Sequence, residues 1–175
     1  MTSRWHPDES TFLYRYYLPA PVRVEDVEVE ESTNWDVIAN LIEESDQLIL
    51  HPSVSRLREK HEKGYHFFLA WRRGNPVGVI AVNKIEFYTS VVKYLYVSQR
   101  VRRQGIGSAL LEKATMYAHE EIGTPVAECT SIAENRAVRG LKRSLGYRPV
   151  GRFESPMSDN VLVLWVHGTQ IAGVI

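Results

Sequence analysis

The stretch KYLYVSQRVRRQGIGSALLEKATMY, from Lys93 to Tyr117, carries the strongest structural signal in the chain. Its first part is apolar and aromatic as far as Val97, as in a buried strand. A polar turn follows that is rich in arginine and contains two glycines, and then apolar residues recur at the period of a helix, at Ile106, Leu110 and Ala114. The stretch therefore predicts a strand, a basic loop and a helix that begins directly from that loop.

Such a loop is suited to bind an anion. The first turn of a helix has backbone N–H groups without an intrahelical partner, and the helix dipole adds positive charge there. Gly105 and Gly107 would let the backbone approach a ligand closely, because they have no Cβ atom. Arg102 and Arg103 stand at this positive end, where a cation is unfavourable unless an anion binds. The alternative is a solvated basic turn whose glycines serve packing.

Two common phosphate-binding motifs fit the loop poorly. A P-loop requires a lysine directly after its last glycine, whereas this loop ends Gly107-Ser108-Ala109. A dinucleotide fingerprint requires a third glycine three residues after Gly107, where the chain has Leu110. The residues Arg102-Arg103-Gln104-Gly105-Ile106-Gly107 instead resemble the Gln/Arg-X-X-Gly-X-Gly/Ala signature of the GNAT superfamily of acyltransferases.

The resemblance to GNAT enzymes implies a site for coenzyme A (CoA). In that superfamily the loop holds the pyrophosphate of CoA, and the strand before it hydrogen-bonds the pantetheine arm and the thioester. The resemblance implies acetyl-CoA as a co-substrate, and no metal ion. It assigns coenzyme binding to Leu95, Tyr96, Val97, Arg102, Arg103, Gln104, Gly105, Ile106, Gly107 and Ser108.

A second match to the superfamily begins at Asn135. There, an Asn opens the helix after the fifth strand and Gly-Phe or Gly-Tyr ends it, and Asn135 and Gly146-Tyr147 have that spacing. The resemblance implies that Asn135 contacts CoA; the plain alternative is a helix N-cap, and both roles can hold together. The basic residues of this helix would either meet the 3′-phosphate of the nucleotide or form a solvated face. These residues are Arg139, Lys142 and Arg143.

The chain departs from the superfamily pattern at Lys142. Many members have a Tyr at this position, seven residues after the Asn, where it protonates the leaving thiolate. A lysine cannot reproduce the geometry of a phenol, although an ammonium can stabilise a thiolate. Lys142 is therefore a candidate catalytic residue, and the alternative is a CoA-binding module of the same fold that has little or no catalytic activity.

No general base is evident from the sequence. An amine must lose its proton to attack a thioester, and deprotonating a lysine-like amine at pH 7 costs roughly 4 to 5 kcal/mol. Glu86, upstream of the central strand, and Glu128, on the next strand, are candidates, although each of them, like His66, also fits a structural or surface role. A bulge near Tyr96 or Val97 would let backbone N–H groups stabilise the carbonyl oxygen as it gains charge.

Composition predicts one globular domain. The chain has 175 residues, of which 44% are hydrophobic and 24% charged, values that are ordinary for a domain with a full core. The formal net charge of zero argues against nucleic acid as a partner, despite the arginine-rich turn. The only cysteine, Cys129, cannot form an internal disulfide, so a cytoplasmic location is the simpler interpretation. Cys129 is expected to be buried and unreactive, because no neighbour in the sequence would lower its pKa.

The pattern of elements, together with the resemblance, predicts an α/β (α+β) fold. We expect a mixed, mostly antiparallel central sheet of about six or seven strands, with a splayed central pair and helices on both faces. Expected strands cover residues 22–30, 65–71, 76–85, 91–97, 126–130, 147–153 and 161–167. Expected helices follow Asn34, cover residues 54–63, follow Gly105 and begin near Asn135. By resemblance, the first two helices would line the acceptor side of the active site.

Residues 1–175 are expected to form a single N-acetyltransferase domain, in which residues 1–20 are an N-terminal arm. The aromatic residues of the arm would pack on the core or on a second subunit, which would make a homodimer. No apolar run approaches the length of a membrane span, so no membrane association is expected. The main hypothesis is an acetyl-CoA-dependent N-acetyltransferase that transfers acetyl directly to a primary amine of a small molecule or peptide.

Overall fold

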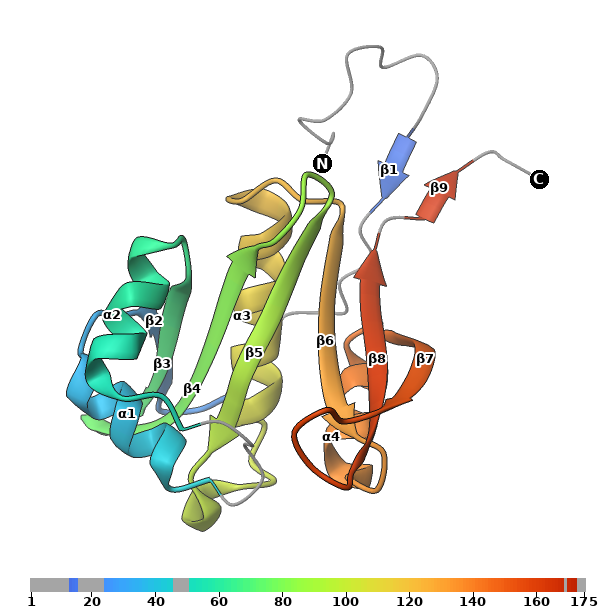
Figure 1. Ribbon diagram of the computed structural model, residues 1–175. Helices are drawn as coiled ribbons and strands as arrows, with labels where there is room; N and C mark the ends of the chain where they lie inside the picture. The colour runs from blue at the N-terminus through green and yellow to red at the C-terminus, as the bar shows by residue number, and fades with distance from the viewer. Residues whose placement is uncertain (1–12, 16–23, 46–50, 169, 173–175) are drawn as a thin grey trace.

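The computed structural model describes residues 13–15, 24–45, 51–168 and 170–172. Seven strands form one mixed sheet in the order β2-β3-β4-β5-β6-β8-β7, with helices on its two faces (Figure 1). The strands are β2 (Val27–Glu31), β3 (His66–Arg72), β4 (Asn75–Lys84), β5 (Thr89–Val97), β6 (Val126–Ile132), β7 (Arg148–Glu154) and β8 (Val161–Gly168). The helices are α1 (Trp35–Glu43), α2 (Val54–Glu62), α3 (Ile106–Glu120) and α4 (Arg136–Ser144), and a 3₁₀ turn covers Gln99–Val101. The predicted fold class is confirmed.

The sheet is buried on both faces because successive side chains of a strand point to opposite sides. Phe67 of β3 packs with Ile38 of α1 and Leu57 of α2 in one apolar core. Its neighbour Phe68 packs with Leu110 of α3 in the other. The pair α1–α2 therefore covers one face of the sheet, and α3 covers the opposite face.

The central strand β5 separates from β6 soon after the two strands meet. These parallel strands pair only over Thr89–Val91 and Val126–Glu128, and their lower ends diverge in Figure 1. On its other edge β5 stays paired with β4, but the register shifts between Val79 and Ala81, and Tyr94 has a φ of 57°. A bulge of this kind bends a strand. The predicted splayed pair is thus observed, and its cause is a bulge in β5.

The first strand of the sheet differs from its prediction. The sequence predicts a strand over residues 22–30, whereas β2 begins at Val27, because Glu25 and Asp26 form a turn in which Asp26 has a φ of 61°. Residues 22 and 23 lie outside the described part of the chain. β2 is nevertheless the edge strand that was expected, since it stands at one end of the sheet.

Most of the predicted N-terminal arm lies outside the described residues. Leu13–Arg15 form β1, which pairs antiparallel with β9 (Gln170–Ala172) near the C-terminus. Packing of the arm on the core or on a second subunit stays a prediction, as does the single domain over residues 1–175. Within the described ranges, no helix is long and apolar enough to cross a membrane.

Two buried histidines connect α3 to β8. His119 Nε2 lies 2.9 Å from His167 Nδ1, and His119 Nδ1 lies 2.7 Å from the carbonyl oxygen of Thr124. A carbonyl oxygen only accepts, so Nδ1 of His119 carries a proton and Nε2 accepts from His167. Burial lowers the pKa of His119 to about 4, because a charged imidazolium would lose its hydration there. His119 is therefore neutral at pH 7.

Candidate functional site

The divergence of β5 and β6 leaves a cleft of about 880 Å³, which is within the usual range for a site that binds a small molecule or coenzyme. Its walls are the end of β5, the loop before α3, the first turn of α3 and the start of α4. Every residue that the resemblance assigns to CoA binding lines this cleft, Asn135 included, except Gln104. The structure therefore brings together two sequence segments that the superfamily pattern singled out separately.

The loop before α3 has the backbone conformation of an anion site. Arg103 and Gly105 have φ angles of 62° and 85°, in the left-handed region. Residues in this region can turn successive N–H groups toward one point, and strain at a non-glycine residue such as Arg103 is found mainly at functional sites. Among the described residues no side chain caps α3, whose first intrahelical bond runs from Ala109 N to Gly105 O over 3.0 Å. The N–H groups of the first turn thus have no acceptor within the helix.

Arg102 is held against β5 beside this turn. Its Nε donates to the carbonyl oxygen of Val97 over 2.9 Å, and its guanidinium carbon lies 5.6 Å from the centroid of the Tyr96 ring. These contacts fix a positive charge at the anion end of the cleft. Gln104 instead accepts a hydrogen bond from Arg72 of β3, so it connects the loop to the sheet rather than lining the cleft.

Gly107 has space for a side chain within the protein itself. A Cβ atom added there would lie 3.5 Å from Leu141 Cδ2 and 3.7 Å from Val97 Cγ2, which are ordinary van der Waals distances. Gly105 differs, because its positive φ of 85° is strained for most residues that have a Cβ atom. A substitution at Gly107 would therefore block the cleft with little disturbance of the fold.

Asn135 caps α4, since its Oδ1 accepts from Val138 N over 3.1 Å. It also lines the cleft, so the cap is observed and the contact with CoA stays a prediction. Arg139 Nη1 donates to the carbonyl oxygen of Ala133 over 3.1 Å, and Arg143 is exposed. Neither arginine is among the described residues that line the cleft, and their contact with a 3′-phosphate is untested.

One predicted role placed Lys142 on a solvated face of α4, and that prediction is wrong. It is 2% exposed, and its Nζ donates to the carbonyl oxygen of Thr130 over 2.7 Å. The reason is helical spacing, which places Lys142 on the same side of α4 as the buried Leu145. Burial lowers the pKa of Lys142, an effect that the nearby Cys129 opposes. The position where many superfamily members carry a Tyr thus connects α4 to β6 here, outside the described lining of the cleft.

Cys129 is buried, as predicted, but one reason given for its inertness is wrong. The ammonium of Lys142 lies near the thiol and acts to lower its pKa. Burial has the larger effect and raises the pKa of Cys129 overall. The thiol is therefore protonated at pH 7, which removes its nucleophilicity.

The two carboxylates predicted as bases do not line the cleft within the described residues. Glu86 is exposed in the turn between β4 and β5, at the opposite end of β5 from the basic loop. A strand of nine residues separates them by roughly 25 Å. Glu128 is half-buried on β6, between its partners Val91 and Val166. His66, weighed with them, lies 2.7 Å from Glu31 Oε1 and is also outside the described lining of the cleft. Among the described residues, no group of three or more potential ligands could hold a metal ion.

Sequence reasoning missed Glu44, a carboxylate that is outside the described lining of the cleft but contacts Tyr96, which belongs to that lining. Glu44 follows the last residue of α1, and its Oε2 accepts from Tyr96 Oη and from Ser98 Oγ, each over 3.2 Å. Burial raises the pKa of Tyr96, and the Glu44 carboxylate raises it further, so the phenol keeps its proton. Glu44 and Tyr96 are 52 positions apart. The only signal for their contact is the apolar stripe that packs α1 on the sheet.

The model of a protein family described as "Acetyltransferase (GNAT) family" matches residues 28–147. N-acetyltransferase family 8 member 3 of Rattus norvegicus is 27% identical over 113 residues, which are 61% of this chain and 49% of that protein. The chain thus spans about half the length of this curated relative.

Solved structures of acetyltransferases have the same fold. The ribosomal-protein-alanine N-acetyltransferase from Brucella melitensis has a TM-score of 0.68 and 20% identity, covering 81% of this chain and 99% of its own. A mutant of the spermidine N-acetyltransferase from Vibrio cholerae has a TM-score of 0.66 and 13% identity, covering 81% of this chain and 92% of its own. At these identities the likeness is one of fold.

Proposed function

Because the chain belongs to the acetyltransferase (GNAT) family, we propose that it transfers an acetyl group from acetyl-CoA directly to a primary amine. The observation that carries this proposal is that the end of β5, the first turn of α3 and the start of α4 all line one cleft. The named acceptors of proteins with this fold range from a ribosomal-protein alanine to spermidine, so fold alone does not decide between peptide and small-molecule amines.

The diphosphate of CoA would bind at the basic loop. The N–H groups of Ile106, Gly107 and Ser108, which have no acceptor within α3, offer hydrogen bonds, and Arg102 adds a fixed positive charge. Hydrogen bonds to charged acceptors are stronger than neutral ones. The left-handed residues before the helix shape the turn in advance, so little ordering is needed on binding.

The pantetheine arm would lie along β5. Beyond Val91 the edge of β5 that faces β6 pairs with no strand of the described residues, so backbone groups there can pair with an extended ligand. The thioester would then lie beside Leu95–Val97, where backbone N–H groups could stabilise the carbonyl oxygen as it becomes negative.

Glu44 is the group that we assign to receive the proton of the amine, directly or through a water molecule. Tyr96 and Ser98 orient its carboxylate at the edge of the cleft. When the neutral amine attacks, a bond forms between its nitrogen and the acetyl carbon, and the bond from that carbon to sulfur breaks. The amine proton passes to Glu44, and the departing thiolate takes a proton from water. The hydroxide that this leaves is neutralised by the proton that Glu44 then releases.

Calorimetric titration with acetyl-CoA tests the first half of the proposal. We expect the native protein to bind acetyl-CoA with micromolar affinity, and Gly107→Glu to bind it about 100-fold or more weakly. The control is Gly151→Glu, which adds the same charge on β7 at a position where no atom lies within 4 Å of an added Cβ. This variant should bind as the native protein does. If Gly107→Glu binds acetyl-CoA as tightly as the native protein does, the diphosphate does not bind at the basic loop and the assignment is wrong.

Thiol release from acetyl-CoA in the presence of a panel of primary amines tests the second half. Steady turnover would exclude the alternative of a catalytically inactive CoA-binding module, which the Lys at position 142 motivates. Binding of acetyl-CoA with no amine-dependent thiol release would favour that module instead.

A further inference from the structure

A second hollow, of about 600 Å³, lies between α2 and β5, and we call it the α2 groove. The residues of its lining that matter here are Arg56, Glu59, Lys60, Lys63, Tyr65 and Tyr94. Three of these are cations and one is a carboxylate, in a chain whose formal net charge is zero. The α2 groove is therefore a local concentration of positive charge.

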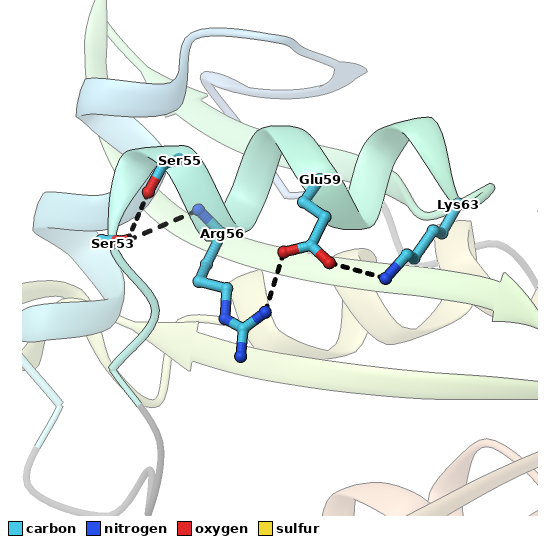
Figure 2. A network of polar contacts seen from close by, with 5 residues as sticks. All are labelled: Ser53, Ser55, Arg56, Glu59 and Lys63. Atoms are coloured by element: carbon cyan, nitrogen blue, oxygen red, sulfur yellow. Dashed lines mark hydrogen bonds and ion pairs between the residues drawn. The ribbon is translucent and has the colours of Figure 1, made fainter.

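Glu59 compensates two of the three cations. Its carboxylate lies 2.8 Å from Arg56 Nη1 and 2.6 Å from Lys63 Nζ, between the two side chains along α2 (Figure 2). Hydrogen bonds from Lys63 and then from Arg56 hold the pKa of Glu59 at about 2, so this carboxylate stays ionised at pH 7. One carboxylate that faces two cations leaves a net positive charge at this rim.

Lys60 is the uncompensated cation of the α2 groove. Its Nζ lies 4.9 Å from the centroid of the Tyr65 ring and 5.8 Å from that of Tyr94. The residue is half-buried, and within the described part of the chain no carboxylate forms an ion pair with it. Aromatic faces recover only part of the hydration that such an ammonium loses. An anionic ligand would supply the missing partner.

The α2 groove is adjacent to the reacting end of the cleft. Tyr94 lines the groove and Tyr96 lines the cleft, and both rings belong to the same core on the α1–α2 face of the sheet. Two residues of strand span about 7 Å. Beside Tyr96 stands the negative Glu44, and beside Tyr94 stands the positive Lys60. This polarity matches a ligand with an amine at one end and an anion at the other.

We propose that the α2 groove binds an anionic group of the acceptor, so that the enzyme acetylates amines that also carry a carboxylate or similar anion about 7 Å from the nitrogen. The inference rests on the proposed function and specifies its substrate class. The anion could belong to a small amino acid or to an acidic residue next to a peptide amine, because both present the same chemistry to Lys60.

Matched acceptors test the preference. We would compare 5-aminopentanoate with its neutral amide, 5-aminopentanamide, and the peptide amide Ala-Glu-Ala-Ala with Ala-Gln-Ala-Ala, at saturating acetyl-CoA. We expect kcat/KM to be about tenfold to a hundredfold higher for the charged member of the preferred pair, with most of the difference in KM. The pair that shows the larger ratio identifies the source of the anion. Equal rates within both pairs, or faster neutral acceptors, would overturn the inference.

Variants of α2 then locate the site. Lys60→Met keeps the apolar stem on the two rings and should remove the preference by raising KM for the charged acceptor, with the neutral one unaffected. Arg58→Met removes a positive charge from an exposed position of the same helix that does not line the groove, and should keep the preference. Glu59→Gln should lower KM for the charged acceptor, because it frees Arg56 and Lys63. A preference that survives Lys60→Met would place the anion elsewhere and overturn the assignment.

A binding measurement separates this inference from the proposed function. Calorimetric titration of the CoA-loaded protein with pentanoate, which has no amine to acetylate, should show binding that Lys60→Met weakens about tenfold or more and Arg58→Met does not. If no amine is acetylated, this titration decides the inference alone. If acetylation occurs with no charge preference and pentanoate does not bind, the transferase proposal stands and the inference fails.

Discussion

The cleft beside α3 and the α2 groove lie at neighbouring points of β5 but are built from different parts of the chain. The cleft presents backbone groups of a loop and of helix starts, with glycines that let a ligand approach. The α2 groove presents the ends of long charged side chains and two tyrosine rings. A site made of backbone groups requires particular residues, such as glycines, at fixed positions, so it is recognisable as a sequence motif. A charged helix face can be made from many combinations of residues, so it has no such motif.

Blocking one region without affecting the other is the largest effect that we expect. Gly107→Glu places a carboxylate where the diphosphate would bind, and should weaken acetyl-CoA binding about 100-fold or more through like-charge repulsion. Pentanoate binding in the α2 groove should be unchanged in this variant, and acetyl-CoA binding should be unchanged in Lys60→Met. Parallel titrations of both ligands check this independence, and a loss of both ligands in either variant would show that the regions are one site.

Acid should weaken the fold on which both regions depend, because His119 lies in the core that joins α3 to β8. Its pKa is about 4 in the folded protein against an ordinary value of 6.5. Between these values the unfolded chain binds a proton that the folded protein excludes, so stability is complete above pH 6.5 and falls toward pH 4. The free energy of unfolding should fall by about 3 kcal/mol over this window.

Denaturant titrations at intervals from pH 7 to pH 4 measure this dependence. The range from pH 6.5 to pH 5 is the most informative, because the ordinary pKa values of carboxylates lie below it. His119→Asn, whose amide can still donate to Thr124, should flatten the curve there. A native protein whose stability does not change between pH 6.5 and pH 5 would contradict the assigned protonation of His119.

Glu44 contacts Tyr96 and Ser98 at the end of β5, and its charge should affect the rate of transfer more than the affinity for acetyl-CoA or for pentanoate. Glu44→Gln keeps the size of the side chain and removes the proton acceptor, so kcat should fall about tenfold to a hundredfold or more. Acetyl-CoA affinity should stay within about threefold of native, since the carboxylate bonds to Tyr96 and Ser98 rather than to the basic loop. Single-turnover kinetics at several pH values would measure the rate of acetyl transfer in Glu44→Gln. A rate equal to that of the native protein would assign the proton transfer to another group.

Lys142→Met should have the smallest effect on function. The side chain is buried next to Thr130 and does not line the cleft as described, so turnover should stay within about threefold of native. The variant loses a hydrogen bond and also a buried charge, two effects of opposite sign, so unfolding should change by no more than about 2 kcal/mol. A loss of kcat near a hundredfold would restore Lys142 as the acid that protonates the thiolate.

Much of the fold could be predicted because its signals are local. The glycine loop, the helix start at Ile106 and the cap at Asn135 depend on neighbours within a few residues, and each lies where the sequence indicates. Local signals mislead at Glu25–Asp26, where valines stand on both sides of the pair but the chain turns before β2 begins at Val27. They also fail for Lys142, whose charge predicts exposure although its helical position faces the core.

The sequence alone determined the family, the layered α/β fold and most of the residues that line the cleft. Each of these depends on short segments, in which glycines, helix caps and the spacing of apolar residues specify the local structure. Only the tertiary structure decided which carboxylate contacts Tyr96 and which cation covers Tyr94 on the same face of β5. Glu44 meets Tyr96 through the docking of α1, and Lys60 meets Tyr94 through the docking of α2. Such contacts form between side chains that are distant in sequence. The apolar residues of a helix decide where it docks, and the charged residues of the same helix are carried to their partners as a result.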